Sequence, residues 1–229
     1  MQQQLAWERQ PDDRQWVKPE GNDPRTLYQM LMTSAERFSE HPCFGYIPGP
    51  GMPRVHLNYR EFGELATAVG KQLRDVGVNA GDRVAMILNN SVEWAAISYG
   101  ANALGAAYTA MYTHQHGAEW AYILDDSKPS LIAVADTEVL DKLVANLPSD
   151  AASWPQCGVL LLGDEPANEL PPEGVTVHQW SEFVAAGRAS EAPIEVADDP
   201  FALNTLIYTS GTTGNPKGVM LTNWNTLSN

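Results

Sequence analysis

Apolar and polar positions alternate along this chain in stretches that each have the length of one helix or one strand. Helices are predicted at 26–38, 60–76, 91–104, 119–124 and 137–147, the first two from apolar residues that recur on one face at the 3.6-residue period. Short apolar runs between them predict buried strands at 84–88, 106–111, 131–135, 159–162 and 201–208. This alternation is typical of an α/β fold with an open, doubly wound, mostly parallel sheet.

Polar residues of the capping type stand at the starts of three of these helices. Thr26 followed by Gln29, and Asn58 followed by Glu61, have the spacing of a capping box. Ser91 precedes the third helix, where its hydroxyl can accept a hydrogen bond from a backbone N–H. We expect all three residues to fix the helix starts.

The same pattern bears on domain organisation. Residues 1–25 mix Gln, Pro, Asp and Arg with scattered Trp and predict an irregular arm, whereas 26–229 predict one domain. The Pro-, Glu- and Asp-rich stretches 163–174 and 187–200 are expected to be connections. Residues 94–117 carry no formal charge, but they are rich in Ala, Gly, Tyr and Thr, so a buried helix, a turn and a buried strand are expected rather than a transmembrane segment.

Charge changes the picture because it is unevenly spread. The net charge is −14, and residues 116–229 hold four Lys and Arg against 16 Asp and Glu. Such a field repels nucleic-acid backbones and anionic lipid, so neither is an expected partner. Lys217 is one of the four cations, and an anion bound there would need a local, directed site. Cys43 and Cys157 form no CxxC and are expected to be free thiols.

A strand followed by a loop rich in glycine and hydroxyl groups carries the candidate chemistry. Glycines let the backbone come close to a ligand, successive N–H groups in such turns bind anions, and hydroxyls and a lysine add donors. The residues concerned are Thr209, Ser210, Gly211, Thr212, Thr213, Gly214 and Lys217. The spacing is not that of a Walker A loop, since only two residues separate Gly211 from Gly214. A flexible Gly/Thr hairpin is the alternative without a ligand.

Residues 208–222 resemble the signature loop of AMP-forming adenylating enzymes, which include acyl-CoA synthetases, peptide-synthetase adenylation domains and luciferases. Further similar segments are Tyr59–Phe62, Gly81–Ala85, Asn90–Trp94 and Tyr122–Ser127. The sequence around the last of these segments is most similar to that of long-chain fatty acyl-CoA synthetases. The resemblance implies the N-terminal portion of the acyl-CoA synthetase fold, cut off after the phosphate loop.

The resemblance implies that the loop holds the β- and γ-phosphates of ATP, which leave as pyrophosphate when a carboxylate attacks the α-phosphorus. Mg²⁺ would offset the phosphate charge, and coenzyme A would accept the acyl group. The loop's part is positioning and charge stabilisation. No catalytic residue is expected in this chain, because the family's later motifs are absent, and the chain alone is expected to be inactive.

Several points differ from the family or stay open. Asn223 stands where the family often has His, and it is expected to cap the following helix. His114 and His116 have metal-ligand spacing without a supporting cluster, so no metal site is predicted. A peptide-synthetase-like adenylation domain and a short non-catalytic nucleotide- or partner-binding module are the rival hypotheses. A cytoplasmic or peripheral membrane location is expected, whereas the acyl substrate and the oligomeric state do not follow from the sequence.

Overall fold

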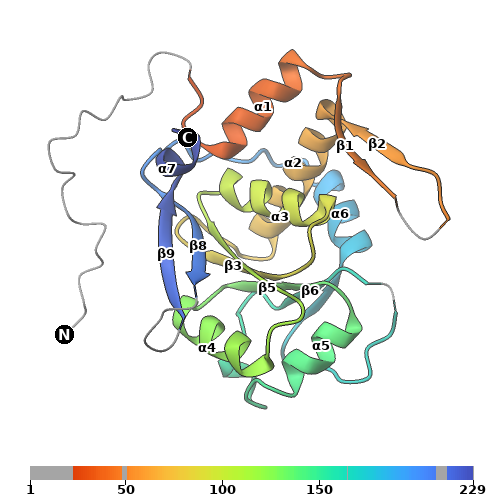
Figure 1. Ribbon diagram of the computed structural model, residues 1–229, viewed down its shortest axis with the longest axis vertical. Coiled ribbons are helices and arrows are strands. Elements are labelled where there is room, and N and C mark those ends of the chain that lie inside the picture. The colour runs from red at the N-terminus through yellow and green to blue at the C-terminus, as the bar shows by residue number, and fades with distance from the viewer. Residues whose placement is uncertain (1–22, 48–50, 164, 210–215, 229) are drawn as a thin grey trace, which may run out of the picture.

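The computed structural model describes residues 23–47, 51–163, 165–209 and 216–228. A seven-stranded sheet of order β7-β6-β5-β3-β4-β8-β9 forms the centre, and β1 and β2 form a separate antiparallel hairpin (Figure 1). The strands are β1 (Pro42–Tyr46), β2 (Val55–Asn58), β3 (Arg83–Ile87), β4 (Ala107–Met111), β5 (Leu131–Val134), β6 (Val159–Leu161), β7 (Val177–Gln179), β8 (Leu203–Thr209) and β9 (Lys217–Thr222). All neighbours in the large sheet pair in parallel except β8 and β9, which are antiparallel.

Helices cover both faces of this sheet (Figure 1). They are α1 (Leu27–Arg37), α2 (Tyr59–Asp75), α3 (Val92–Ala103), α4 (Gly117–Ser127), α5 (Thr137–Val144), α6 (Trp180–Ala189) and α7 (Asn223–Leu227). Strand β3 contributes to two cores in alternation: Val84 and Met86 pack with α2 and α3, whereas Ala85 and Ile87 pack with α4 and α5. The doubly wound, mostly parallel sheet predicted from the sequence is therefore confirmed.

Helices α2 and α3 approach each other backbone to backbone. A Cβ added at Gly100 would lie 2.9 Å from the backbone nitrogen of Gly70 and 3.1 Å from the carbonyl oxygen of Ala66. A Cβ at Gly70 would likewise lie 3.1 Å from the Gly100 carbonyl oxygen. Glycine at both positions permits this close packing, which seats α3 over β3 and β4.

The predicted caps are found with one difference. Asn58 and Glu61 form a reciprocal capping box at α2, and the Ser91 hydroxyl accepts from the Trp94 N–H at α3. Thr26 caps α1 by accepting from the Gln29 N–H, but the Gln29 side chain accepts from the N–H of Arg25 rather than from that of Thr26. The prediction of a full capping box at α1 is therefore wrong, because the Gln29 side-chain oxygen accepts from the N–H of Arg25, the residue before the cap.

Other expectations concern connections and burial. The uncharged stretch 94–117 forms most of α3, a turn at Gly105 with φ of +74°, and the buried strand β4, as predicted. In the described part of the chain no helix has both the length and the hydrophobicity that crossing a bilayer requires. The sequence did not indicate the β1–β2 hairpin, β7 or α6, and α6 extends to Ala189 within the expected connection 187–200.

Candidate functional site

The candidate site lies where three neighbouring parallel strands end. Strands β3, β4 and β8 are adjacent, and the glycine-rich loop follows β8 directly. The chain leaves β3 through α3 to reach β4 on one side, then crosses through α4 to reach β5 on the other. Ligands of open α/β sheets bind outside the carboxyl ends of the strands at such a reversal of strand order.

The loop leaves the sheet between two paired residues. Thr209 ends β8 and Lys217 begins β9, and the two are partners in the antiparallel register. Both side chains are exposed, and directly opposed residues of antiparallel strands project to the same face. The structure thus brings Thr209 and Lys217 together, as the sequence prediction requires. The predicted residues Ser210, Gly211, Thr212, Thr213 and Gly214 lie outside the described residues.

The opposite face of this hairpin packs on α4. Tyr208 and Gly218 form the next pair in the register, and the Tyr208 hydroxyl donates to Oδ2 of Asp126 at 2.6 Å. Burial raises the pKa of Tyr208, and the hydrogen bond to Asp126 and its negative charge raise it further. We refer to Tyr208, Thr209, Lys217 and Gly218 below as the loop stem.

A pocket of about 480 Å³ opens beside the loop stem at the ends of β3, β4 and β8. It has amide, aromatic and aliphatic walls, and its lining includes Asn89, Trp94, Tyr108, Tyr112 and Ile207. The Thr113 hydroxyl donates to Oδ1 of Asn89 at 3.1 Å and joins the loops that follow β3 and β4. The Trp94 and Tyr108 rings meet edge to face at 5.6 Å. The rule that ligands bind outside the carboxyl ends of parallel strands is the signal that would have pointed to these residues as lining.

Buried polar side chains hold β8 in place beneath this pocket. The Thr205 hydroxyl donates to the Tyr108 carbonyl at 3.0 Å, and the Asn204 amide donates to the Thr226 hydroxyl at 3.2 Å. Asn223 was expected to cap α7, but Thr222 is the cap and forms a capping box with Asn225. Asn223 is instead the first helical residue, and its amide donates to the Asp199 carbonyl at 3.3 Å. The hydroxyl one position earlier fits the capping geometry, which explains the shift.

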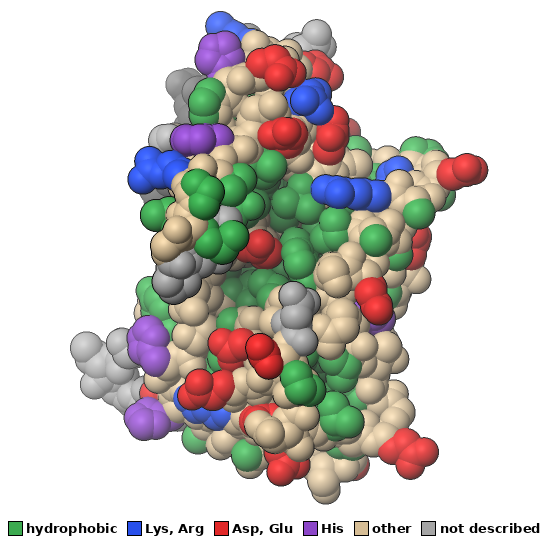
Figure 2. All heavy atoms as spheres, turned by 90° about the vertical axis from the view of Figure 1, so that its right-hand side faces the viewer, with side chains coloured by type: hydrophobic (Ala, Val, Ile, Leu, Met, Phe, Trp, Pro, Cys, Tyr) green, Lys and Arg blue, Asp and Glu red, His purple; other side chains and the backbone are tan. Residues whose placement is uncertain are grey.

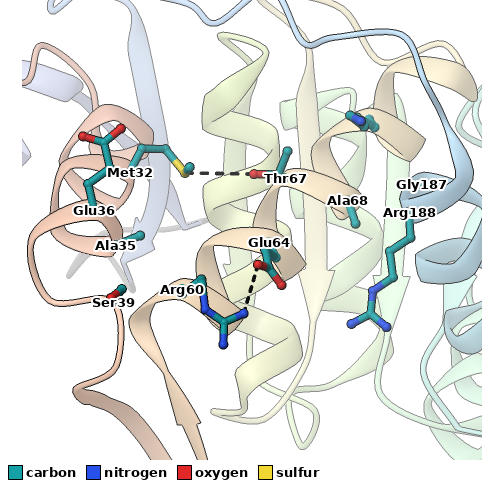
Figure 3. A pocket seen from close by; sticks show the side chains of 11 residues that line it. Met32, Ala35, Glu36, Ser39, Arg60, Glu64, Thr67, Ala68, Gly187 and Arg188 are labelled. Atoms are coloured by element: carbon teal, nitrogen blue, oxygen red, sulfur yellow. Dashed lines mark hydrogen bonds and ion pairs between the residues drawn. The ribbon is translucent and has the colours of Figure 1, made fainter.

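A second cavity, of about 630 Å³, lies among α1, α2 and α6 (Figure 3). Arg60 binds Glu64 at its rim, and Arg188 extends from α6 on the far side. None of its lining residues belongs to the loop stem or to the strand ends. The face of the molecule shown in Figure 2 is also hollowed in its middle, where hydrophobic side chains gather beside acidic ones.

The histidines and cysteines take no part in the loop stem. The rings of His114 and Tyr112 stack with centroids 5.5 Å apart, and His116 immediately precedes α4. Within the ranges that the structure describes, no group of three or more His, Cys, Asp or Glu side chains is arranged to hold a metal ion. Cys43 and Cys157 are free thiols, as predicted.

The chain is similar to known proteins over most of its length. The family model described as "AMP-binding enzyme" matches residues 31–229. The long-chain-fatty-acid–CoA ligase ACSBG1 of Bos taurus is 30% identical over 207 residues, which are 86% of this chain and 27% of that protein. Long chain acyl-CoA synthetase 5 of Arabidopsis thaliana is 26% identical over 87% of this chain and 30% of its own length. The chain thus spans less than a third of these curated relatives.

Solved structures share the fold. An inhibitor-bound crystal structure of the N-terminal domain of FACL13 from Mycobacterium tuberculosis matches with a TM-score of 0.61 and 27% identity, over 86% of this chain and 44% of that one. A putative long-chain-fatty-acid CoA ligase from Rhodopseudomonas palustris matches with a TM-score of 0.71 and 22% identity, over 89% and 46% of the two chains. From the family match together with the fold and the loop at the end of β8, this chain belongs to the AMP-binding enzyme family.

Proposed function

We propose that this chain supplies the pyrophosphate-binding loop of an enzyme that activates a carboxylic acid, of the long-chain fatty acid class, in two steps. The carboxylate oxygen attacks the α-phosphorus of ATP and pyrophosphate leaves, which gives an acyl-AMP. The thiol of coenzyme A then attacks the acyl carbonyl and AMP leaves. The single observation that carries the proposal is the pairing of Thr209 with Lys217 at the carboxyl end of β8.

The charges of the described residues suit a polyphosphate at the loop. Lys217 is exposed, and no carboxylate in the described ranges forms an ion pair with it. Its ammonium group is therefore available for an anion, in a half of the chain that is otherwise acidic. Thr209 and Ser210 would donate hydroxyl hydrogen bonds, and Gly211, Thr212, Thr213 and Gly214 would bring backbone N–H groups to the β- and γ-phosphates.

Magnesium would reach this site bound to ATP. The phosphate oxygens would be its main ligands, because the described residues hold no group of three or more His, Cys, Asp or Glu side chains that could bind the ion. The ion would supply positive charge against the phosphates. The chain's own contribution is to hold the pyrophosphate in line for departure, which is positioning and charge stabilisation rather than covalent catalysis.

The proposal also extends to the domain organisation and the substrate class. We further propose that residues 26–229 are the N-terminal part of an adenylation domain and that residues 1–25 precede it. The fatty acid substrate class rests on the names of the relatives, and a cytoplasmic or peripheral membrane location accords with such a substrate. A peptide-synthetase-like substrate is the rival, and assaying amino acids against fatty acids in a protein with a complete adenylation domain separates the two.

Removal of the lysine tests the phosphate role. We expect Lys217→Ala to weaken pyrophosphate binding to this chain by about tenfold to hundredfold, because one charge-assisted contact is lost. Isothermal titration with pyrophosphate and with MgATP measures the effect. Arg188→Ala is the matched control, since it removes another exposed cation of the acidic half, on α6 and away from the loop stem. Equal affinities for the unaltered chain and Lys217→Ala would contradict the proposal.

A further inference from the structure

Three segments that the sequence singled out are joined in space by side-chain hydrogen bonds. They are the Gly-Asp-Arg-Val segment at the start of β3, the end of α4, and the loop stem. Arg83 makes the first connection: its Nε donates to the Ser127 carbonyl at 2.7 Å and its Nη2 to the Lys128 carbonyl at 2.7 Å. A cation that binds the free carbonyls at a helix C-terminus satisfies them and complements the helix dipole.

The last turn of α4 is fixed by further contacts. Lys128 adopts a left-handed conformation with φ of 47°, and its N–H donates to the Leu124 carbonyl as the helix ends. The buried Ser127 hydroxyl donates to the Ile123 carbonyl at 2.6 Å. Asp126 lies in this turn, directly before Ser127, so its carboxylate projects from a backbone that β3 holds through Arg83.

The second connection runs from Asp126 to the loop stem. The Tyr208 hydroxyl donates to Asp126 Oδ2 at 2.6 Å across 82 residues of sequence. A hydrogen bond to an ionised acceptor is among the stronger ones in proteins. Because burial and the adjacent carboxylate raise the pKa of Tyr208, its hydroxyl keeps its proton and stays a donor at neutral pH.

The Tyr208 ring also contacts the other strand of the stem. Gly218 is its register partner on β9, and a Cβ added at Gly218 would lie 3.0 Å from Cζ and 3.3 Å from Oη of Tyr208. The ring therefore fills the space that a side chain at position 218 would need. One aromatic residue thus packs across both strands that lead into the phosphate loop, and its tip is bound to α4.

We propose that Tyr208 is a positioning residue for the phosphate loop, and that its bond to Asp126 ties the loop stem to the end of α4 that Arg83 holds. The inference rests on the proposed phosphate role of the loop and adds to it the contact that holds the loop stem in place. Thr209 directly follows Tyr208, and Lys217 directly precedes Gly218. The distance between Thr209 and Lys217 and the direction of their side chains therefore depend on the contacts that Tyr208 makes. Groups held in place before the ligand arrives bind it at lower entropic cost.

This positioning role predicts a result that a general loss of packing would not give. We expect Tyr208→Phe and Asp126→Ala each to speed backbone hydrogen exchange of the loop-stem amides by about tenfold, in line with the loss of one hydrogen bond to a charged group. The double variant should show little further change, because both substitutions remove the same bond. Asp126→Asn keeps an oxygen acceptor and should restore much of the protection.

The matched control is Asp125→Asn, one residue away on the same helix, whose carboxylate is exposed and pairs only with Lys128 among the described residues. It should leave exchange of the stem unchanged. Pyrophosphate titration of the same variants is the second readout, and Tyr208→Phe and Asp126→Ala should weaken affinity by about three- to tenfold with the fold intact by circular dichroism.

The outcomes separate this inference from the proposed function. Faster stem exchange together with weaker pyrophosphate binding supports the positioning role. Unchanged stem exchange, or faster exchange with unchanged affinity in a chain that binds pyrophosphate, overturns it while leaving the phosphate site standing. If the unaltered chain binds neither pyrophosphate nor MgATP, the proposed function fails, and any role of Tyr208 in positioning that ligand fails with it; the exchange data then measure the hydrogen bond alone.

Discussion

Single residues in this chain combine roles that their sequence context does not reveal. Arg83 belongs to a segment that resembles the adenylating family, yet its guanidinium binds main-chain carbonyls of α4. Those partners are backbone atoms more than 40 positions away, so no residue pattern could indicate them. The same holds for Asp126, whose partner Tyr208 lies 82 positions further along the chain. The role of the loop residues follows from their chemistry, because glycines, hydroxyls and a lysine in this order are typical of anion binding, and that role stays a proposal.

Tyrosine titration gives a prediction at the residue scale. Burial raises the pKa of Tyr208, and its bond to Asp126, the charge of Asp126 and a smaller effect of Tyr122 raise it further, against a lowering by Ser127. Since the folded state favours the protonated phenol, this contribution to stability is complete below the unfolded pKa of about 10 and is lost as pH rises above it. We therefore expect Tyr208→Phe to lose less stability than the unaltered chain between about pH 9 and pH 12.

Urea unfolding at a series of alkaline pH values measures this difference, and ultraviolet absorbance of tyrosinate follows the ionisation directly. Tyr28, Tyr99 and Tyr108 also have pKa values that burial raises, so the unaltered chain and the variant should both lose stability in this range. Tyr112→Phe, at an exposed position, serves as the control. A slope of stability against pH that is the same in Tyr208→Phe and in the unaltered chain would contradict the prediction.

At the scale of elements, the sequence predicted what periodicity and capping determine. The helices 60–76 and 91–104 and the strand 84–88 are found within one or two residues of their observed ends. Strand β7 was missed because it has only three residues, all half-buried, which show neither alternation nor a continuous apolar run. Helix α6 was missed because it is short and contains Gly187, which lowers helix propensity. Close packing explains that glycine, since a Cβ there would come within 2.0 Å of the Ala68 carbonyl oxygen.

The contact between α2 and α3 gives a prediction at this scale. We expect Gly100→Ala to destabilise the chain by about 1–3 kcal/mol, because the new Cβ would meet backbone atoms of α2 that cannot move independently of that helix. Thermal unfolding measures the loss. Gly63→Ala is the matched control, since it is also a buried helical glycine but its Cβ would meet only the side chains of Ala35 and Met32. That variant should lose less, or gain from improved helix propensity, and equal losses in both would sink this account.

At the scale of the whole molecule, chain order decides where the site lies. After β7 at one edge of the sheet, residues 190–202 run back along α2 and α3 to place β8 beside β4. Lys71 donates to the Ser190 carbonyl at 2.7 Å, and Arg74 donates to the Pro193 carbonyl at 2.6 Å along this path. The sequence predicted a connection here but not its route. Strand order depends on such long-range contacts, which is why the sequence alone did not indicate that the ends of β3, β4 and β8 border one pocket.

Charge distribution gives the last prediction, which also belongs to the whole molecule. The net charge is −14, and residues 116–229 carry only four Lys and Arg, so the long-range field opposes an approaching polyphosphate, although in the proposed site Lys217 would attract it at contact. Salt screens the long-range repulsion, with a Debye length near 8 Å at about 0.15 M. We therefore expect the association rate constant for pyrophosphate to rise between about 0.02 and 0.15 M NaCl, opposite to the fall seen where a positive field steers an anion.

Stopped-flow mixing at several salt concentrations measures that rate constant separately from dissociation. Removing acidic charge outside the loop should have the same effect as salt, so Glu169→Gln combined with Glu173→Gln, both in the exposed connection before β7, should raise the rate at low salt and flatten its dependence. Lys217→Ala should change dissociation far more than association, because it removes a contact rather than the field. A steep fall in association rate with added salt would show instead that the loop sits in a local positive field strong enough to outweigh the charge of the whole chain.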